Sequence, residues 1–122
     1  ENHSEAQKLW GSVIERKYTC LTSNLITSEL GTLLAYRFSH DIAFSRIKMI
    51  FDSAIVKRVF STESIENKAL WWWKQFSDQK FSVADCVSFE FMKMLEIDKI
   101  LTYDLDFKIA GFTIVRSKNN LG

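Results

Sequence analysis

Residues 81–107 read FSVADCVSFEFMKMLEIDKILTYDLDF, and this stretch decides the fold class. Ser82 is a typical helix N-cap. The apolar residues that follow recur at helical spacing, so one face is expected to pack inward: Val83, Val87, Phe91, Met94 and Leu95. Residues 99–103 then read as a short buried strand that gives way at Asp104. In an open α/β sheet, the polar groups that do chemistry collect at the carboxyl ends of the strands. The stretch therefore predicts an α/β fold and puts an acidic side chain at its functional edge.

The same alternation of helical and strand patterns runs through the rest of the chain. Helices are expected at about residues 4–17, 24–38, 41–53 and 62–76, the last of them capped by Thr62. Strands are expected at 18–22, 55–60 and 112–115, and the basic middle of 55–60, at Lys57 and Arg58, suits an edge strand. No proline, internal repeat or low-complexity segment interrupts them. This order favours a three-layer sandwich in which a central parallel sheet is flanked by helices. We expect residues 1–122 to form a single domain.

Composition excludes several classes of protein. The 122 residues are 47% hydrophobic and carry a net charge of +1, which argues against holding nucleic acid by bulk charge but is compatible with a local basic rim. Cys20 and Cys86 lie far apart without metal-ligand spacing, so we expect reduced, buried thiols. There is neither a signal-peptide pattern nor an apolar run of ~18 residues. We expect a cytoplasmic protein without a membrane span.

Glu29 is the anomaly of the expected helix over residues 24–38. At about 100° per residue it falls among the leucines, on the face that should be buried. One interpretation is that its carboxylate reaches the helix edge or pairs with Arg37 or Lys48. The other is a functional site, because an ionised carboxylate on a core face is costly unless it is paired or bound to metal. The residues alone leave both interpretations open.

Several motifs together resemble one family. SVADCVSF at residues 82–89, LTYDLDF at 101–107 and AGF at 110–112 resemble the second half of PIN domains, especially the VapC ribonuclease toxins of bacterial and archaeal toxin–antitoxin pairs. LTSNLITSEL at residues 21–30 resembles the segment in which the family carries a glutamate. The resemblance covers nearly the whole chain in order and spacing. It implies a PIN-like fold and a metal site formed by Glu29, Asp85 and Asp104, with Asp106 as a supplement.

Three converging carboxylates have a physical cost. Two of them about 4 Å apart repel by roughly 4 kcal/mol at an effective dielectric of 20, and three cannot all stay ionised without a cation or a shared proton. Oxygen ligands without a Cys or His cluster favour Mg²⁺ or Mn²⁺ over zinc. Taken singly, however, Ser82-x-x-Asp85 is also a helix-capping pattern, and Asp104 and Asp106 can cap the short helix that follows.

The implied function is a Mg²⁺- or Mn²⁺-dependent endoribonuclease, the toxin of a toxin–antitoxin pair. Such an ion can activate a water for phosphodiester hydrolysis, so no protein nucleophile is required. The resemblance also implies a homodimer and a small antitoxin that blocks the site. The RNA would be held by a basic rim that we assign to Arg37, Lys57, Arg58, Lys74 and Lys80.

The sequence departs from the family at its start. Family members generally bring a further aspartate at the end of an opening strand, and Glu1 falls where the family's first helix would begin. We therefore expect an N-terminally truncated domain, in which catalysis by residues 1–122 alone is in doubt. The opening strand would lie between the strands at 18–22 and 99–103. A direct pairing of these two strands would contradict the expected order.

A rival function rests on the run Trp71-Trp72-Trp73. Successive helical residues point about 100° apart, so Trp72 and Trp73 can share the inward face while Trp71 points outward. Tryptophan is enriched at interface hot spots, which makes Trp71 a candidate interface anchor. The alternative is thus a non-catalytic PIN-like or other α/β module for protein contacts, in which the acids are caps and surface charges.

Overall fold

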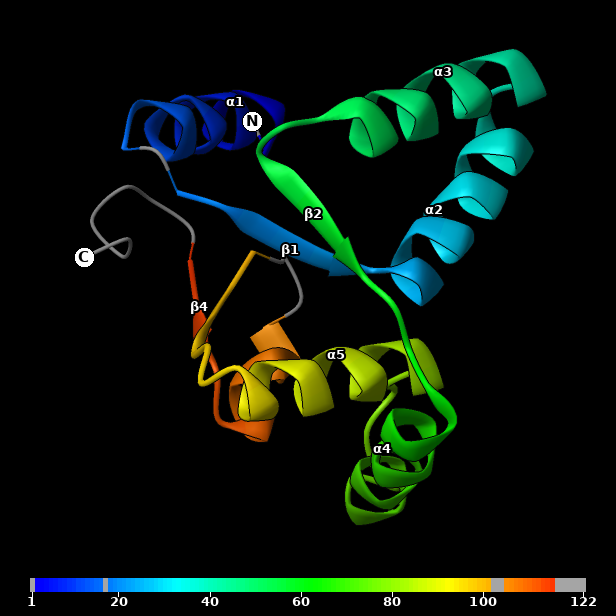
Figure 1. Cartoon of the computed structure of the whole chain (residues 1–122), viewed down its shortest axis with the longest axis vertical. Coiled ribbons are helices and arrows are strands. Elements are labelled where there is room, and N and C mark those ends of the chain that lie inside the picture. Colours follow the sequence, from blue (N-terminus) through cyan, green and yellow to red (C-terminus); the bar gives the residue numbers. More distant parts are fainter. Residues whose placement is uncertain (1, 17, 102–104, 116–122) are drawn as a thin grey trace. The chain divides into compact units, whose positions relative to one another are not determined.

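The computed structural model describes residues 2–16, 18–101 and 105–115. Helices alternate with parallel strands, which confirms the predicted α/β class (Figure 1). The chain divides into two compact units: one is Thr19–Phe91, and the other combines Glu1–Tyr18 with Met92–Gly122. Among the described residues, no helix is long and apolar enough to cross a membrane.

The unit Thr19–Phe91 contains the first parallel pair of strands. Its elements in order are β1 (Cys20–Ser23), α2 (Asn24–Arg37), α3 (His40–Asp52), β2 (Val56–Val59), α4 (Glu63–Gln75) and most of α5 (Val83–Met94). Strands β1 and β2 lie side by side in parallel, with Cys20 opposite Val56 and Ser23 opposite Val59 (Figure 1). The connection between them runs through α2 and α3, as a parallel crossover requires.

Side-chain caps fix where three of these helices begin. The hydroxyl oxygen of Ser23 accepts a hydrogen bond from Ile26 N at 3.2 Å and opens α2. Ser39 and Thr62 do the same for α3 and α4. Such a cap is typically worth about 1 kcal/mol because it satisfies a backbone N–H that has no partner inside the helix. The predicted cap at Thr62 is confirmed.

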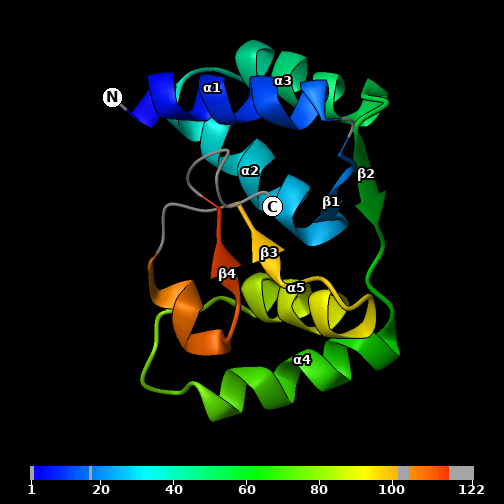
Figure 2. The ribbon, with the colours of Figure 1, turned by 90° about the vertical axis from the view of Figure 1, so that its left-hand side faces the viewer.

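Helices α4 and α5 lie side by side and enclose an aromatic cluster (Figure 2). The ring of Phe89, which is fully buried, packs edge-on against Phe81 at 5.0 Å between centroids and at a tilt of 55° against Trp72 at 5.6 Å. Phe76, just after the end of α4, stacks on Trp72 and packs edge-on against Phe81. The indole N–H of Trp72 donates to Glu90 Oε1 at 3.1 Å, so the cluster includes a buried carboxylate.

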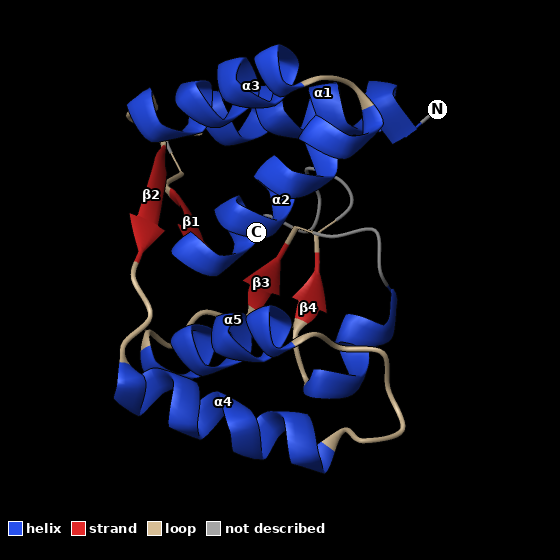
Figure 3. Ribbon diagram, turned by 90° about the vertical axis from the view of Figure 1, so that its right-hand side faces the viewer, coloured by secondary structure: helices blue, strands red, loops and turns tan. Residues whose placement is uncertain are grey.

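The second unit holds α1 (Asn2–Glu15), β3 (Lys99–Ile100), a 3₁₀ helix η1 (Leu105–Ala110) and β4 (Thr113–Ile114). Strands β3 and β4 are parallel (Figure 3), with Ile100 opposite Ile114. Gly111 adopts φ of 96°, a conformation that glycine takes without steric cost, and its N–H bonds to Lys108 O where η1 ends. Among the described residues the strands pair as β1–β2 and β3–β4, so the β1–β3 pairing that would contradict the expected order is not among them.

The predicted inward face of α5 is wrong in part. Val83 and Leu95, which the spacing placed inward, are 39% and 47% exposed. The buried residues of the helix are instead Ala84, Cys86, Val87, Phe89, Glu90 and Met92. At 100° per residue these six point in all directions around the axis, as in a helix that is enclosed rather than laid on a surface. A single apolar stripe is therefore the wrong template for α5.

Candidate active site

Glu29 lies in the middle of α2 and is exposed, with its carboxylate held by a distant serine. Ser82 Oγ donates to Glu29 Oε1 at 3.4 Å, across 53 residues of sequence. The expected partners are not used, because Lys48 pairs with Asp52 at 2.8 Å and Arg37 forms no ion pair with a described residue. The face of α2 that was expected to be dry is partly open, since Leu33 is 48% exposed. Glu29 thus needs no buried counter-charge.

Asp85 lies in the first turn of α5 and is half-buried. Its Oδ2 accepts from the backbone N–H of Ser82 at 2.9 Å, while Ser82 Oγ accepts from Asp85 N at 3.1 Å. These reciprocal bonds form a capping box, so the capping interpretation of this acid is confirmed. They use only one carboxylate oxygen. Among the described residues, the other oxygen of Asp85 has no hydrogen-bonding partner.

Ser82 is the residue that joins the two acids. Its one hydroxyl donates to Glu29 on α2 and accepts from the backbone of Asp85 on α5. Two carboxylates from different helices are thereby brought to a common side chain within one unit. From the sequence, Ser82 was predicted only as a helix cap, on the basis of its capping motif. No sequence spacing indicated its contact with Glu29.

The thiol of Cys86 follows Asp85 and adds no charge to this site. Burial, helped by the nearby negative charge of Asp85, raises the pKa of Cys86 from 9.0 to about 11. Burial also raises the pKa of Cys20. Both thiols therefore stay protonated near neutral pH, and neither is an activated nucleophile. The polar groups at this site are oxygens.

The remaining predicted acids belong to the second unit. Asp104 lies outside the described residues, and Asp106 is in the 3₁₀ helix η1. In the part of the chain that the structure describes, no group of three His, Cys, Asp or Glu side chains is placed to hold a metal ion. Glu29 and Asp85 each keep one oxygen without a described protein partner, and carboxylate oxygens are the ligands that a hard cation takes. The full ligand set stays a prediction.

The five predicted RNA-binding side chains all lie in the unit Thr19–Phe91, and none forms an ion pair with a described carboxylate. Lys80 precedes the capping serine by two residues. Arg37 ends α2, and Lys57 and Arg58 are neighbours on β2. Lys74 lies over the ring of Trp71 at 5.2 Å. Their ammonium and guanidinium groups are thus available to an external anion.

The three successive tryptophans of α4 have different surroundings. Trp71 is 66% exposed, as predicted. Trp72 faces the aromatic cluster and Glu90. Trp73 was expected to share that inward face, but it is 46% exposed and its indole N–H donates to Phe81 O at 3.0 Å. A 100° step per residue leaves room for only one of the two side chains inside the cluster.

Comparison with known proteins gives one consistent result. No family profile matches the chain. It is 31% identical over 114 residues to the 23S rRNA-specific endonuclease VapC20 of Mycobacterium tuberculosis, from two strains, with 93% of this chain and 84% of the relative aligned. The crystal structure of Mycobacterium tuberculosis VapC20, described as a sarcin–ricin loop cleaving toxin, matches with a TM-score of 0.83 at 31% identity, covering 93% of this chain and 85% of that one.

Proposed function

We propose that this chain, which belongs to the VapC family of PIN-domain ribonuclease toxins, is a metal-dependent endoribonuclease whose active site includes Glu29 and Asp85. The observation that carries the proposal is the link through Ser82, which brings two carboxylates from separate helices together. A capping box by itself needs only Ser82 and Asp85, at the start of α5. The hydrogen bond from the Ser82 hydroxyl to the exposed Glu29 is not needed for capping, and it favours a functional site that includes both acids.

Glu29, Asp85 and Asp104 would hold a Mg²⁺ or Mn²⁺ ion, with Asp106 as a supplement. When bound, such an ion polarises a phosphoryl oxygen and lowers the pKa of the attacking water. Carboxylate oxygens are the ligands that these hard cations prefer.

The protein's own contribution is to hold the acids in place before substrate arrives. The backbone N–H of Ser82 fixes one oxygen of Asp85 and leaves the other free. The hydroxyl of Ser82 restrains the longer, more flexible side chain of Glu29. Groups that are held in advance lose less conformational freedom when the reaction geometry forms, which lowers the barrier.

The proposed substrate is a structured RNA loop. The sarcin–ricin loop of 23S rRNA is the first candidate, because VapC20 is described as a 23S rRNA-specific endonuclease and as a sarcin–ricin loop cleaving toxin. Basic side chains without carboxylate partners would contact its phosphates, a sequence-independent contact that positions the RNA.

VapC toxins come with an antitoxin, so we further propose a small protein partner that blocks this site. Trp71, exposed on α4, is the proposed anchor for a protein contact such as a homodimer interface.

The test is cleavage of a sarcin–ricin-loop RNA hairpin by the full-length protein in Mn²⁺. Glu29→Gln and Asp85→Asn should each lower kcat by at least about a hundredfold, the scale on which loss of a positioned charge acts. Asn retains an oxygen that can accept from Ser82 N, so Asp85→Asn should leave the cap intact. Glu66→Gln, which removes an exposed acid from the first turn of α4, is the matched control. Wild-type cleavage by Asp85→Asn would show that Asp85 is only a cap.

A further inference from the structure

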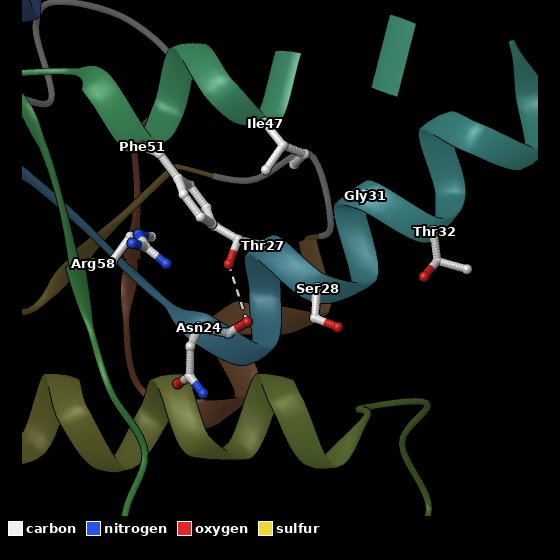
Figure 4. A pocket seen from close by; sticks show the side chains of 8 residues that line it. All are labelled: Asn24, Thr27, Ser28, Gly31, Thr32, Ile47, Phe51 and Arg58. Carbon is white, nitrogen blue, oxygen red and sulfur yellow. Dashed lines mark hydrogen bonds between the residues drawn. The ribbon is translucent and has the colours of Figure 1, made fainter. Parts of the chain in front are cut away.

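A groove of about 400 Å³ runs between α2, α3 and β2, and no step described above uses it. All of its lining belongs to the unit Thr19–Phe91. Figure 4 shows polar or small residues following one another along α2, opposite Ile47 and Phe51 from α3 and Arg58 from β2. Its volume falls in the usual range for small-ligand sites, which is roughly 300–1,000 Å³.

Arg58 is the charged group of this groove, and it is held without being neutralised. Its guanidinium carbon lies 3.4 Å from the centre of the Phe51 ring and 5.1 Å from that of Phe60. Among the described residues no carboxylate lies within 4.0 Å of it. Aromatic contacts fix the plane of a guanidinium while its N–H groups stay available. Arg58 is therefore a prepared anion contact.

The α2 wall adds neutral hydrogen-bonding groups along one side of the groove. Asn24 Oδ1 accepts from Ser61 N at 2.9 Å, so the amide oxygen is used while its NH₂ group remains a donor. Ser28 and Thr32 carry hydroxyls on successive turns. A guanidinium beside amide and hydroxyl groups suits a phosphate and its ribose better than an apolar peptide.

The groove and the acidic site share helix α2 on neighbouring faces. At 100° per residue, Glu29 points about 60° from Thr32 and about 100° from Ser28. Glu29 is therefore on a face next to the groove and does not line it. A ligand in it would lie beside the proposed cleavage point without occupying it.

We propose that this groove binds the phosphate and ribose of an RNA nucleotide that flanks the cleaved linkage, with Arg58 as its principal contact. The inference rests on the proposed ribonuclease function and adds to it a defined subsite. It assigns Arg58 a role different from that of a rim charge. The guanidinium makes a directed contact with one phosphate.

The first experiment measures binding of a labelled sarcin–ricin-loop RNA hairpin to full-length protein in an Asp85→Asn background, so that RNA is not cut. Arg58→Met keeps an unbranched side chain against Phe51 but removes the charge, and should weaken binding about tenfold, as expected for a charge-assisted contact. It should also lower the slope of log K against log salt by about one. Thr32→Val should weaken binding about threefold, as for one neutral hydrogen bond. Arg46→Met is the charge-matched control and should change binding less than twofold. Arg46 is an exposed arginine of α3 that contacts Met49.

The second experiment locates the phosphate. The hairpin is made with a neutral methylphosphonate at one linkage at a time. One linkage flanking the cleavage point should weaken binding to the protein with Arg58 about tenfold and leave binding to Arg58→Met unchanged, because the contact is already lost. Additive losses at every linkage would overturn the proposal.

The outcomes separate the subsite from the function. If protein with Asp85 intact cleaves the hairpin and Arg58→Met binds it as Arg46→Met does, the subsite is wrong and the ribonuclease function stands. If that protein neither binds nor cleaves RNA, both fall. If Arg58→Met binds RNA normally but loses affinity for the antitoxin, the groove is a protein contact and the subsite is wrong.

Discussion

Helix α5 carries two acids whose surroundings differ, Asp85 in its first turn and Glu90 near its middle. Asp85 is half-buried and bonded to the backbone of Ser82, with one oxygen uncommitted among the described residues. Glu90 is only 5% exposed and accepts from the indole of Trp72 inside the aromatic cluster. Five residues apart, one acid can take an external ligand while the other is enclosed.

The difference shows that a carboxylate can be hydrogen-bonded without being enclosed. An enclosed polar group must be hydrogen-bonded or it costs free energy, and Glu90 meets this requirement through a tryptophan on another helix. Asp85 meets it through the helix end, where backbone N–H groups lack partners in any case. A cap therefore satisfies an acid without surrounding it. We expect mutations in the enclosed region to change stability, and mutations at the helix start to change ligand binding.

The largest effect should come from Phe89→Ala in the enclosed region. Phe89 is fully buried between Phe81 and Trp72, so removing its ring should destabilise the protein by about 3–5 kcal/mol. Urea unfolding measures the loss. Trp71→Ala on the exposed side of α4 should stay within about 0.5 kcal/mol. Equal losses for the two variants would mean that the aromatic cluster is not the core of this unit.

The next effect concerns metal at the helix start. Mg²⁺ or Mn²⁺ at a hundredfold excess over its dissociation constant should stabilise the full-length protein by ~2.7 kcal/mol, which raises its melting temperature. Asp85→Asn should abolish that rise, whereas Glu90→Gln should keep it. If metal raises the melting temperature of Asp85→Asn as much as that of the wild type, the acid acts as a cap alone.

A smaller effect should separate a structural role of Glu90 from a role in RNA cleavage. Glu90→Leu leaves the Trp72 indole N–H without its acceptor and should cost about 1–3 kcal/mol. Glu90→Gln retains an acceptor oxygen, so its cost should be less than about 1 kcal/mol. Chemical denaturation compares the two, with RNA cleavage as a second measurement. A loss of cleavage in Glu90→Gln without a loss of stability would make Glu90 a member of the active site.

The smallest effect is a pH dependence from Cys86, which lies between the two acids. Its pKa is raised to about 11 from 9.0, so the folded protein holds this proton more tightly than the unfolded chain does. The resulting stabilisation is complete below pH 9 and is lost as the pH rises towards 11. Relative to Cys86→Ala, wild type should lose about 1 kcal/mol of stability between pH 8 and pH 10. A constant difference between the two proteins over this range would show that the thiol does not titrate as described.

Local features of the fold were predictable from sequence because they depend on neighbouring residues. The cap at Thr62 and the box formed by Ser82 and Asp85 each need only a hydroxyl or carboxylate within one turn of a backbone N–H. The alternation of helices and parallel strands followed from periodicity. The outward position of Trp71 followed from the 100° step of the helix.

Glu29 was singled out for a reason that the structure corrects. The spacing put it on a dry face, but α2 leaves that face partly open and the acid is exposed. Periodicity reports which residues share a face and says nothing about what covers it. The partner of Glu29 is Ser82, 53 residues away, where no spacing rule reaches.

The surroundings of Glu90 and Arg58 could not be predicted from the sequence either. Nothing in the FEF run at residues 89–91 distinguishes an enclosed acid from a surface one, and only the packing of α4 against α5 supplies the Trp72 indole. Arg58 read as one basic residue of an edge strand, and only α3 brings Phe51 to its guanidinium. Local hydrogen bonds are set by residues one turn apart, so the sequence by itself determined the caps and the elements. The environment of each charged side chain depends on which distant element covers it, and that was decided by the tertiary structure.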